Sequence, residues 1–415
     1  MKKVALVLVA AIMFFSGCGQ KANQQLAARK SVAEVGVPRF SIDYCQDVRT
    51  WWGQHPLNPA SPNYRAEIQS PRNTVTLPDG ADIQAAINAL PAEGGTIILQ
   101  KGSYGGFEIV RRQNIHFRGE DGATITGGVR VFGCEDVRDY GGFSSCAHQR
   151  KPSCIDCLYH QPTQNIYFRN LSFNGGMTCR TCRGVMWDKC RFTGRSHTAH
   201  AVNNHLYYRD CEFLGSGGYA VYWDGVHGGG YLNCTFGPGY QRMFLQGYTN
   251  DDFTWDYNND ENWSGHEDRE LAYVVFAGNH FGPVGGFAMT YAGSHLLVTG
   301  NQAEKMPDLV QATAKQSAKN YTFNSYDLVV TNNRAPEVKN LLHVLGSLKR
   351  PKDNPNLQEW YVWTEYNIGR YTVENNLIGK DAQAVFEDKR EGKVDGPNFV
   401  KNNGPEVNPD APGKK

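Results

Sequence analysis

Side chains that can move protons are concentrated between residues 195 and 291 of the 415-residue sequence. Histidine, tyrosine and arginine can act as general acids or bases, and an aspartate can serve hydrolysis when a second carboxylate lies nearby. The candidate catalytic residues are His200, Tyr222, Asp224 and Arg242, with His197, His227 and Tyr291 as further candidates. The alternative interpretation is that these polar side chains are only solvated.

An acidic stretch in the same region has oxygen ligands at the spacing of a calcium loop. It resembles the loop of an EF-hand, in which alternate residues and a final glutamate bind the ion. It departs from that loop where Glu261 replaces the glycine of the sharp turn, and a solvated acidic loop is the alternative. The predicted calcium ligands are Asp256, Asn258, Asp260, Asn262 and Glu267.

The cysteines offer either disulfides or a metal site. Two C-x-x-C pairs, Cys154 with Cys157 and Cys179 with Cys182, have the ligand pattern of a zinc site. The residues between the pairs also amount to about one coil of the repeat described below, so that one pair can lie above the other. An oxidising compartment favours disulfides, and a four-cysteine zinc site is the alternative.

A repeat explains how residues far apart in the sequence come together. Four segments align, each with a phenylalanine, and the phenylalanines are 19, 21 and 23 residues apart. The side chains two residues before each phenylalanine are predicted to point inward and to stack on one another with a spacing of about 4.8 Å. The members of this stack are Leu171, Cys190, Cys211, Cys234, Asn279, Asn301, Asn333 and Asn375. The pattern predicts about nine or ten coils.

The start of this region supplies a family resemblance. A short helix that Asp82 can cap is followed by Gly94-Gly95, an apolar strand at residues 96–99 and Gly102-Ser103-Tyr104. This series resembles the N-terminal cap and first coil of pectin-lyase-like right-handed parallel β-helices. The chain is therefore predicted to be all-β, a single-stranded right-handed parallel β-helix with a short N-terminal capping helix. The aromatic segment from Phe40 to Asn73 is expected to cover one end.

The resemblance implies where chemistry would take place. In such proteins one outer strip forms a groove for a sugar chain, and bound calcium can neutralise a uronate carboxylate. The implied function is action on a polysaccharide, as a lyase for an acidic glycan or, alternatively, as a hydrolase. A non-catalytic glycan-binding or adhesive protein and a structural envelope protein are the competing interpretations. The usual motifs of pectate lyases, polygalacturonases and mannuronan epimerases are absent from the sequence.

The N-terminus predicts export. Two lysines, an apolar run and Ser16-Gly17-Cys18 make up a signal peptide at residues 1–17 that resembles a lipobox, with Cys18 lipidated. An ordinary signal peptide is the alternative. Residues 18–40 are predicted to be a tether, residues 41–390 the β-helix with its cap, with core coils from about residue 74, and residues 391–415 a flexible tail.

Composition limits the partners. The net charge is +1, which argues against nucleic acid as a partner. We therefore expect a monomer at the cell envelope, on the outer membrane or cell surface, that is held to the membrane by its lipid and contacts a polysaccharide.

Overall fold

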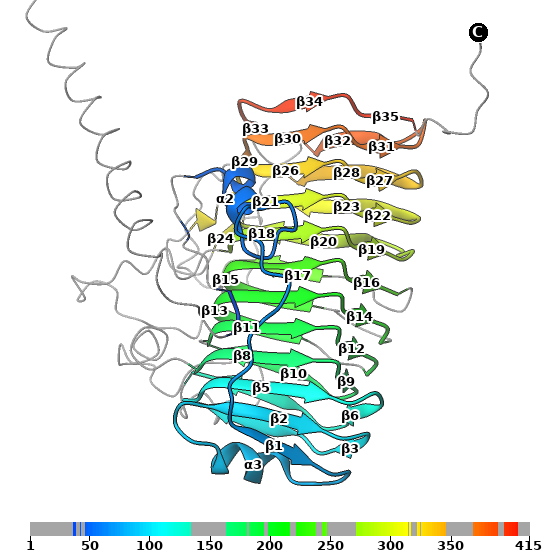
Figure 1. Ribbon diagram of the computed structural model, residues 1–415. Helices are drawn as coiled ribbons and strands as arrows, with labels where there is room; N and C mark the ends of the chain where they lie inside the picture. Colours follow the sequence, from blue (N-terminus) through cyan, green and yellow to red (C-terminus); the bar gives the residue numbers. More distant parts are fainter. Residues whose placement is uncertain are drawn as a thin grey trace, which may run out of the picture.

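The computed structural model describes residues 36–38, 42, 46–133, 163–180, 182–194, 198–215, 221–237, 243–246, 271–313, 315–316, 322–323, 325–345, 368–388 and 394–405. For residues 198–202, 222, 224, 244, 246, 287, 315–316, 322–323 and 395 it describes only the backbone. The chain winds into a right-handed parallel β-helix with three faces, which confirms the predicted fold class (Figure 1).

Most coils contribute one strand to each face. The strands of face 1 are β4 (Phe107–Val110), β7 (Val129–Phe132), β10 (Met177–Arg180), β17 (Met243–Gln246), β20 (Phe287–Ala292), β23 (Met306–Ala312), β28 (Val338–Leu345) and β32 (Gln383–Asp388). The strands of face 2 are β1 (Thr74–Leu77), β2 (Gly95–Leu99), β5 (Gln113–Gly119), β8 (Thr163–Arg169), β11 (Cys182–Asp188), β18 (Ala272–Ala277), β21 (Ser294–Thr299), β26 (Leu328–Thr331), β30 (Tyr371–Glu374) and β34 (Phe399–Lys401).

Two long strands continue from face 1 into face 2. They are β13 (Thr198–Arg209) and β15 (Val221–Leu232), and they join the two faces into one 20-stranded parallel sheet. Face 3 is an 11-stranded parallel sheet. Its strands are β3 (Gly102–Tyr104), β6 (Ala123–Ile125), β9 (Ser172–Phe173), β12 (Arg191–Phe192), β14 (Glu212–Phe213), β16 (Thr235–Phe236), β19 (His280–Phe281), β22 (Gln302–Ala303), β27 (Arg334–Ala335), β31 (Leu377–Ile378) and β35 (Gly404–Pro405).

Two small pairings lie outside these faces. Strands β24 (Lys315–Gln316) and β25 (Thr322–Phe323) pair antiparallel, and β29 (Ile368–Gly369) pairs parallel with β33 (Val394–Asp395). The last coil, with β34 and β35, extends the β-helix into residues 394–405, beyond the predicted boundary at residue 390.

The repeat stacks as predicted. Neighbouring rings of five phenylalanines lie nearly parallel, with centroids 4.8 to 5.2 Å apart: Phe173, Phe192, Phe213, Phe236 and Phe281. Next to them runs the ladder of buried cysteines and asparagines. Each asparagine carboxamide bonds to the backbone and side chain of a neighbouring coil, through Asn279, Asn301, Asn333, Asn376 and Asn403.

The prediction that Asn375 belongs to the ladder is wrong by one residue. The turn from face 2 to face 3 has two residues in this coil, and Asn375 takes the first place with a left-handed φ of 57°. Asparagine tolerates that conformation better than most residues do. The second residue, Asn376, is buried in the ladder. The sequence Asn375-Asn376 therefore fills both turn positions, as Asn332-Asn333 does in an earlier coil.

Helix α3 (Ile83–Ala89) covers the N-terminal end of the stack (Figure 1). The Asp82 side chain caps it by accepting a hydrogen bond from the Ala85 backbone N–H, at 3.1 Å. Ile83 and Ile87 pack into the interior of the first coils. This confirms the predicted capping helix. Among the described residues no helix is long and apolar enough to cross a membrane.

Residues 46–73, here called the strap, lie along the outer side of face 2 and not over one end as predicted (Figure 1). Helix α2 (Val48–Gln54) places Trp51 and Trp52 against this face. The physical reason is that face 2 also has large side chains on its outer side, such as Tyr207 and Tyr273. Burying them under the strap removes their apolar surface from water.

Candidate functional site

The register of face 1 shows which predicted residues share a row. Tyr222 pairs with Ala199 on one side and with Phe244 on the other. Asp224, two residues along the strand, pairs with Ala201 and Gln246. His200 pairs with Cys179 and Trp223, whose side chains are buried. The row of Tyr222 continues through three more strands, at Thr290, Gln311 and His343.

Two predicted candidates do not lie on the outer surface. Tyr291 belongs to the interior core and donates a hydrogen bond to the Ser294 carbonyl oxygen, at 2.6 Å. His227 is also buried. Neither side chain can therefore line an open groove as expected. His197 and Arg242 lie outside the described residues, as do the predicted lipidation site Cys18 and the calcium ligands Asp256, Asn258, Asp260, Asn262 and Glu267.

The described cysteine pair does not support the disulfide prediction. Cys179 and Cys182 are free, buried thiols, and burial raises the pKa of each. The Cys182 thiol donates to the carbonyl oxygens of Val131 and Arg180, at 3.2 and 3.1 Å. Both thiols therefore stay protonated at neutral pH unless a metal ion displaces their protons. Their predicted partners Cys154 and Cys157 lie outside the described residues.

A polar cluster that sequence reasoning missed lies further along the same row of face 1. It consists of Asp308 and Gln311 on β23, with Asn340 and His343 on β28. The Asp308 carboxylate accepts hydrogen bonds from Gln311 Nε2 at 2.6 Å and from Asn340 Nδ2 at 2.7 Å. Its Oδ2 also lies 2.9 Å from His343 Nδ1. We call these four residues the Asp308–His343 cluster.

A break in strand alternation creates this cluster. On β23 both Leu309 and Val310 are buried, so Asp308 and Gln311 on either side of them can meet on the outer side. On β28 Leu341 and Leu342 are buried in the same way, and Asn340 and His343 flank them. The strands pair Asp308 with Asn340 and Gln311 with His343. The same irregularity in adjacent coils thus brings four polar side chains together.

The three hydrogen bonds hold Asp308 in its charged form. Burial opposes the charge, but the bonds from Gln311, His343 and Asn340 outweigh it and lower the pKa of the carboxyl. An ionised carboxylate next to Nδ1 fixes the imidazole with Nδ1 as the donor, which leaves Nε2 with a lone pair. Asp308 therefore positions His343 as a proton acceptor.

Two acceptors of the cluster have no hydrogen-bond partner among the described residues. They are His343 Nε2 and Asn340 Oδ1, both shielded from solvent. Buried acceptors are normally satisfied, and a ligand can supply the missing donors only if the side chains that shield these two atoms move aside. The cluster is recessed, since 14% of the His343 side chain and 6% of the Asp308 side chain are exposed. Phe386 lies next to it, with its ring centroid 4.8 Å from that of His343 and 40% of the residue exposed.

This arrangement can take a proton and hold a polar ring. His343 Nε2 is a general base that an anionic partner orients, and Phe386 offers an aromatic face on which the C–H side of a sugar ring can stack. No group of three or more histidine, cysteine, aspartate or glutamate residues that could hold a metal occurs within the described ranges.

One signal in the sequence could have revealed the cluster. Met306-Pro-Asp-Leu-Val-Gln-Ala and Val338-Lys-Asn-Leu-Leu-His-Val align position by position, with polar residues at the third and sixth places of each. The two segments start 32 residues apart, because the β24–β25 segment lies between them. That distance is longer than the coils of 19 to 23 residues from which the repeat was recognised.

Comparisons with known proteins assign no activity. No protein-family model matches the chain, and no curated protein matches its sequence. It is similar to the A-module of the mannuronan C-5 epimerase AlgE6 from Azotobacter vinelandii, with 14% identity over 79% of this chain and 97% of that chain, at a TM-score of 0.39. The surface adhesin PfbA of Streptococcus pneumoniae has 10% identity over 78% of this chain and 90% of that chain, at a TM-score of 0.37.

A third solved structure is the polygalacturonase from Erwinia carotovora. It has 9% identity over 80% of this chain and 99% of that chain, at a TM-score of 0.35. Similarity this distant leaves the function to be inferred from the residues of the site.

Proposed function

We propose that this protein acts on an acidic polysaccharide as a lyase, with His343 as the base that takes the C5 proton of a uronate. The observation that carries the proposal is His343 Nε2, which has no partner among the described residues while Asp308 holds the opposite nitrogen. In β-elimination the electron pair of the C5–H bond forms the C4–C5 double bond. The C4–O bond breaks, and the leaving oxygen takes up a proton from an acid or from water.

The cluster favours elimination over hydrolysis. Glycoside hydrolysis ordinarily needs two carboxyl groups, one on each side of the bond. Asp308 accepts three hydrogen bonds, and its lowered pKa makes it a poor acid. Within the described residues no second carboxylate bonds to the cluster. Proton abstraction by a single oriented imidazole needs only the base that is present.

The residues of the earlier coils remain a second hypothesis for the catalytic set. Tyr222 lies four strands from His343 in the same row, which corresponds to about 19 Å at the usual spacing between strands. A single scissile bond cannot contact both Tyr222 and His343 at that distance. We therefore propose His200, Tyr222, Asp224 and Arg242 as glycan contacts along the same face, and as the alternative base and acid if His343 fails the test below. We also propose that the acidic loop binds calcium and that a lipid on Cys18 holds the protein at the cell envelope. We propose that the protein is a monomer.

The activity test uses the purified protein and a panel of uronate polysaccharides. Elimination creates an unsaturated uronate, which absorbs in the ultraviolet, whereas hydrolysis does not. The assay is repeated with calcium and with a chelator. No absorbance on any substrate, together with binding to at least one, would support the non-catalytic glycan-binding alternative instead.

A matched pair of variants tests the role of His343. His343→Gln removes the imidazole nitrogen that would accept the proton, and a loss of about 10²- to 10⁴-fold in rate is expected for a general base. His280→Gln is the control, because His280 is also paired with a carboxylate, Glu304 at 2.9 Å, but lies on face 3. If His343→Gln and the unchanged protein have equal rates, His343 is not the base, and the base is to be sought among His200, Tyr222, Asp224 and Arg242.

A further inference from the structure

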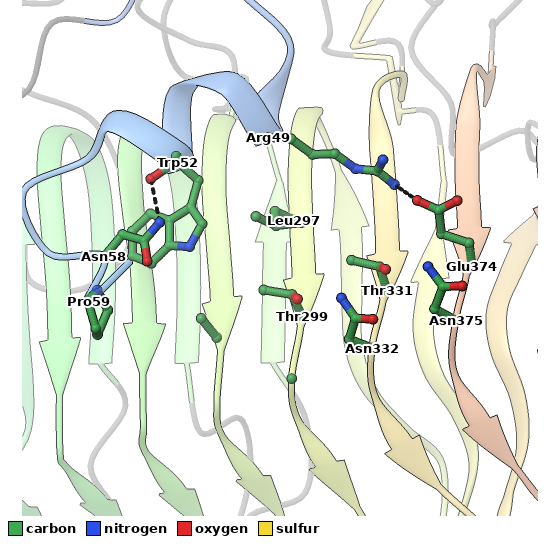
Figure 2. Close-up of a pocket in the computed structure, with 13 residues that line it drawn as sticks. Arg49, Trp52, Asn58, Pro59, Leu297, Thr299, Thr331, Asn332, Glu374 and Asn375 are labelled. Carbon is green, nitrogen blue, oxygen red and sulfur yellow. Dashed lines mark hydrogen bonds and ion pairs between the residues drawn. The ribbon is translucent and has the colours of Figure 1, made fainter. Parts of the chain in front are cut away.

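A cavity lies on face 2, away from the Asp308–His343 cluster. It has a volume of about 500 Å³ and lies between the strap and the outer side of β18, β21, β26 and β30 (Figure 2). This volume is within the range of about 300 to 1,000 Å³ that is common for small-molecule sites. We call it the strap groove.

The two sides of the strap groove differ in chemistry. Pro59 of the strap is exposed and supplies apolar surface, whereas Trp52 and Leu297, which also line the groove, are largely buried. The strands supply hydroxyl and amide groups in two rows, at Thr299, Thr331, Asn332 and Asn375. Thr299 and Thr331 pair directly in the sheet, and the rows therefore repeat at about 4.8 Å.

The two asparagines present their amides to solvent. Asn332 and Asn375 are exposed, with left-handed φ values of 56° and 57° at the turn that leads to face 3. Figure 2 shows their carboxamides side by side below Thr331 and Glu374. The Asn375 oxygen accepts a hydrogen bond from Asn402 at 3.2 Å, which leaves its amide N–H groups available to a ligand.

The charged groups of the strap groove are already paired. Arg49 contacts Glu374 at 2.5 Å across one end (Figure 2). Lys401 bonds to the other carboxylate oxygen of Glu374 at 3.0 Å. The hydrogen bond from Lys401, together with that from Arg49, lowers the pKa of Glu374 against the effect of burial. The Glu374 carboxylate is therefore ionised and already paired with two cations. It can neither donate a proton to a ligand nor attract a positively charged one, so a neutral ligand fits the groove best.

We propose that the strap groove is a non-catalytic binding site for one or two rings of a neutral sugar. A sugar ring has an apolar C–H face for Pro59 and equatorial hydroxyls for the threonine and asparagine rows. A peptide that binds by adding a strand is less suited, because the strands below the groove already pair on both sides within the sheet. This inference goes beyond the proposed lyase activity and does not depend on it.

The test measures binding of neutral trisaccharides of glucose and mannose by isothermal titration calorimetry, with a trisaccharide of galacturonate as the acidic probe. The double variant Asn332→Gly and Asn375→Gly removes both amides, while glycine keeps the left-handed turn. At least a tenfold loss of affinity is expected for the neutral sugars. Asn233→Gly is the matched control, since Asn233 has the same turn conformation, with a φ of 53°, outside the groove.

Several outcomes would overturn this proposal. They are no binding of any neutral trisaccharide at millimolar concentration, unchanged affinity in the double variant, or tighter binding of the galacturonate probe that the double variant abolishes. A melting temperature of the double variant close to that of the Asn233→Gly control shows that a loss of binding is local. His343→Gln should bind neutral sugars normally, which separates a failure of this site from a failure of the lyase proposal.

Discussion

Buried histidines under the strap should make the protein less stable below neutral pH. His116 packs against Tyr167, and its Nδ1 lies 3.3 Å from the Ser70 hydroxyl of the strap. His295 stacks on Tyr273, with ring centroids 4.2 Å apart. Burial lowers the pKa of each imidazole to about 4. In the unfolded chain both would titrate near their ordinary value of about 6.5.

The sign and size of the effect follow from this difference. Because the unfolded chain binds protons first as the pH falls, stability is complete above about pH 6.5 and decreases until about pH 4. Two pKa values of about 4 and 6.5 correspond to a loss of about 2 kcal/mol for each histidine at pH 5, or about 4 kcal/mol for both. The carboxyl groups with lowered pKa values lose their stabilising effect only at lower pH.

The assay is urea unfolding at pH 7 and at pH 5, followed by tryptophan fluorescence, because Trp51 and Trp52 lie in the strap. His295→Phe keeps an aromatic ring but cannot bind a proton, and should remove about 2 kcal/mol of the pH-dependent loss. His280→Gln, on face 3, should leave the loss unchanged. An unfolding midpoint that is the same at both pH values, or a full pH effect in His295→Phe, would refute the reasoning.

Three further predictions concern the core and the site. Asn301→Ala deletes a buried carboxamide with four hydrogen bonds and should lower the free energy of unfolding by about 3 to 5 kcal/mol in urea melts, whereas the exposed Gln302→Ala should have little effect. Cys179 and Cys182 should react with an alkylating reagent only after unfolding, as mass spectrometry can show; modification in the native protein would contradict their burial. Asp308→Asn should reduce the lyase rate, because His343 loses the carboxylate that orients its ring; an unchanged rate would argue against the pair.

The regular part of the fold could be predicted because a coil repeats. The phenylalanine stack and the ladder depend on a nearly constant number of residues per turn, and both follow from spacing in the sequence. The error at Asn375 has a local cause: two adjacent asparagines satisfy two different demands, a left-handed turn and an inward carboxamide. Spacing alone cannot decide which of Asn375 and Asn376 takes which place.

The strap and the site could not be predicted in the same way. Tyr207 and Tyr273 on the outer side of face 2 look like ordinary exposed residues of an alternating strand, and only the fold shows that Trp51 packs among them. Asp308 and His343 are 35 residues apart and on strands whose alternation is broken, so a strict two-residue period does not place both on the outer side.

The two proposed sites differ in how the fold holds their residues. From β8 onward every turn from face 2 to face 3 has two residues. Asn332 and Asn375 take the first place in two of these turns, and the packing of Trp51 and Trp52 against face 2 holds the strap on the other side of the strap groove. The Asp308–His343 cluster lies on face 1 and is held by hydrogen bonds among its own side chains. A substitution within the cluster should therefore disturb its geometry more than a substitution of one exposed asparagine disturbs the strap groove.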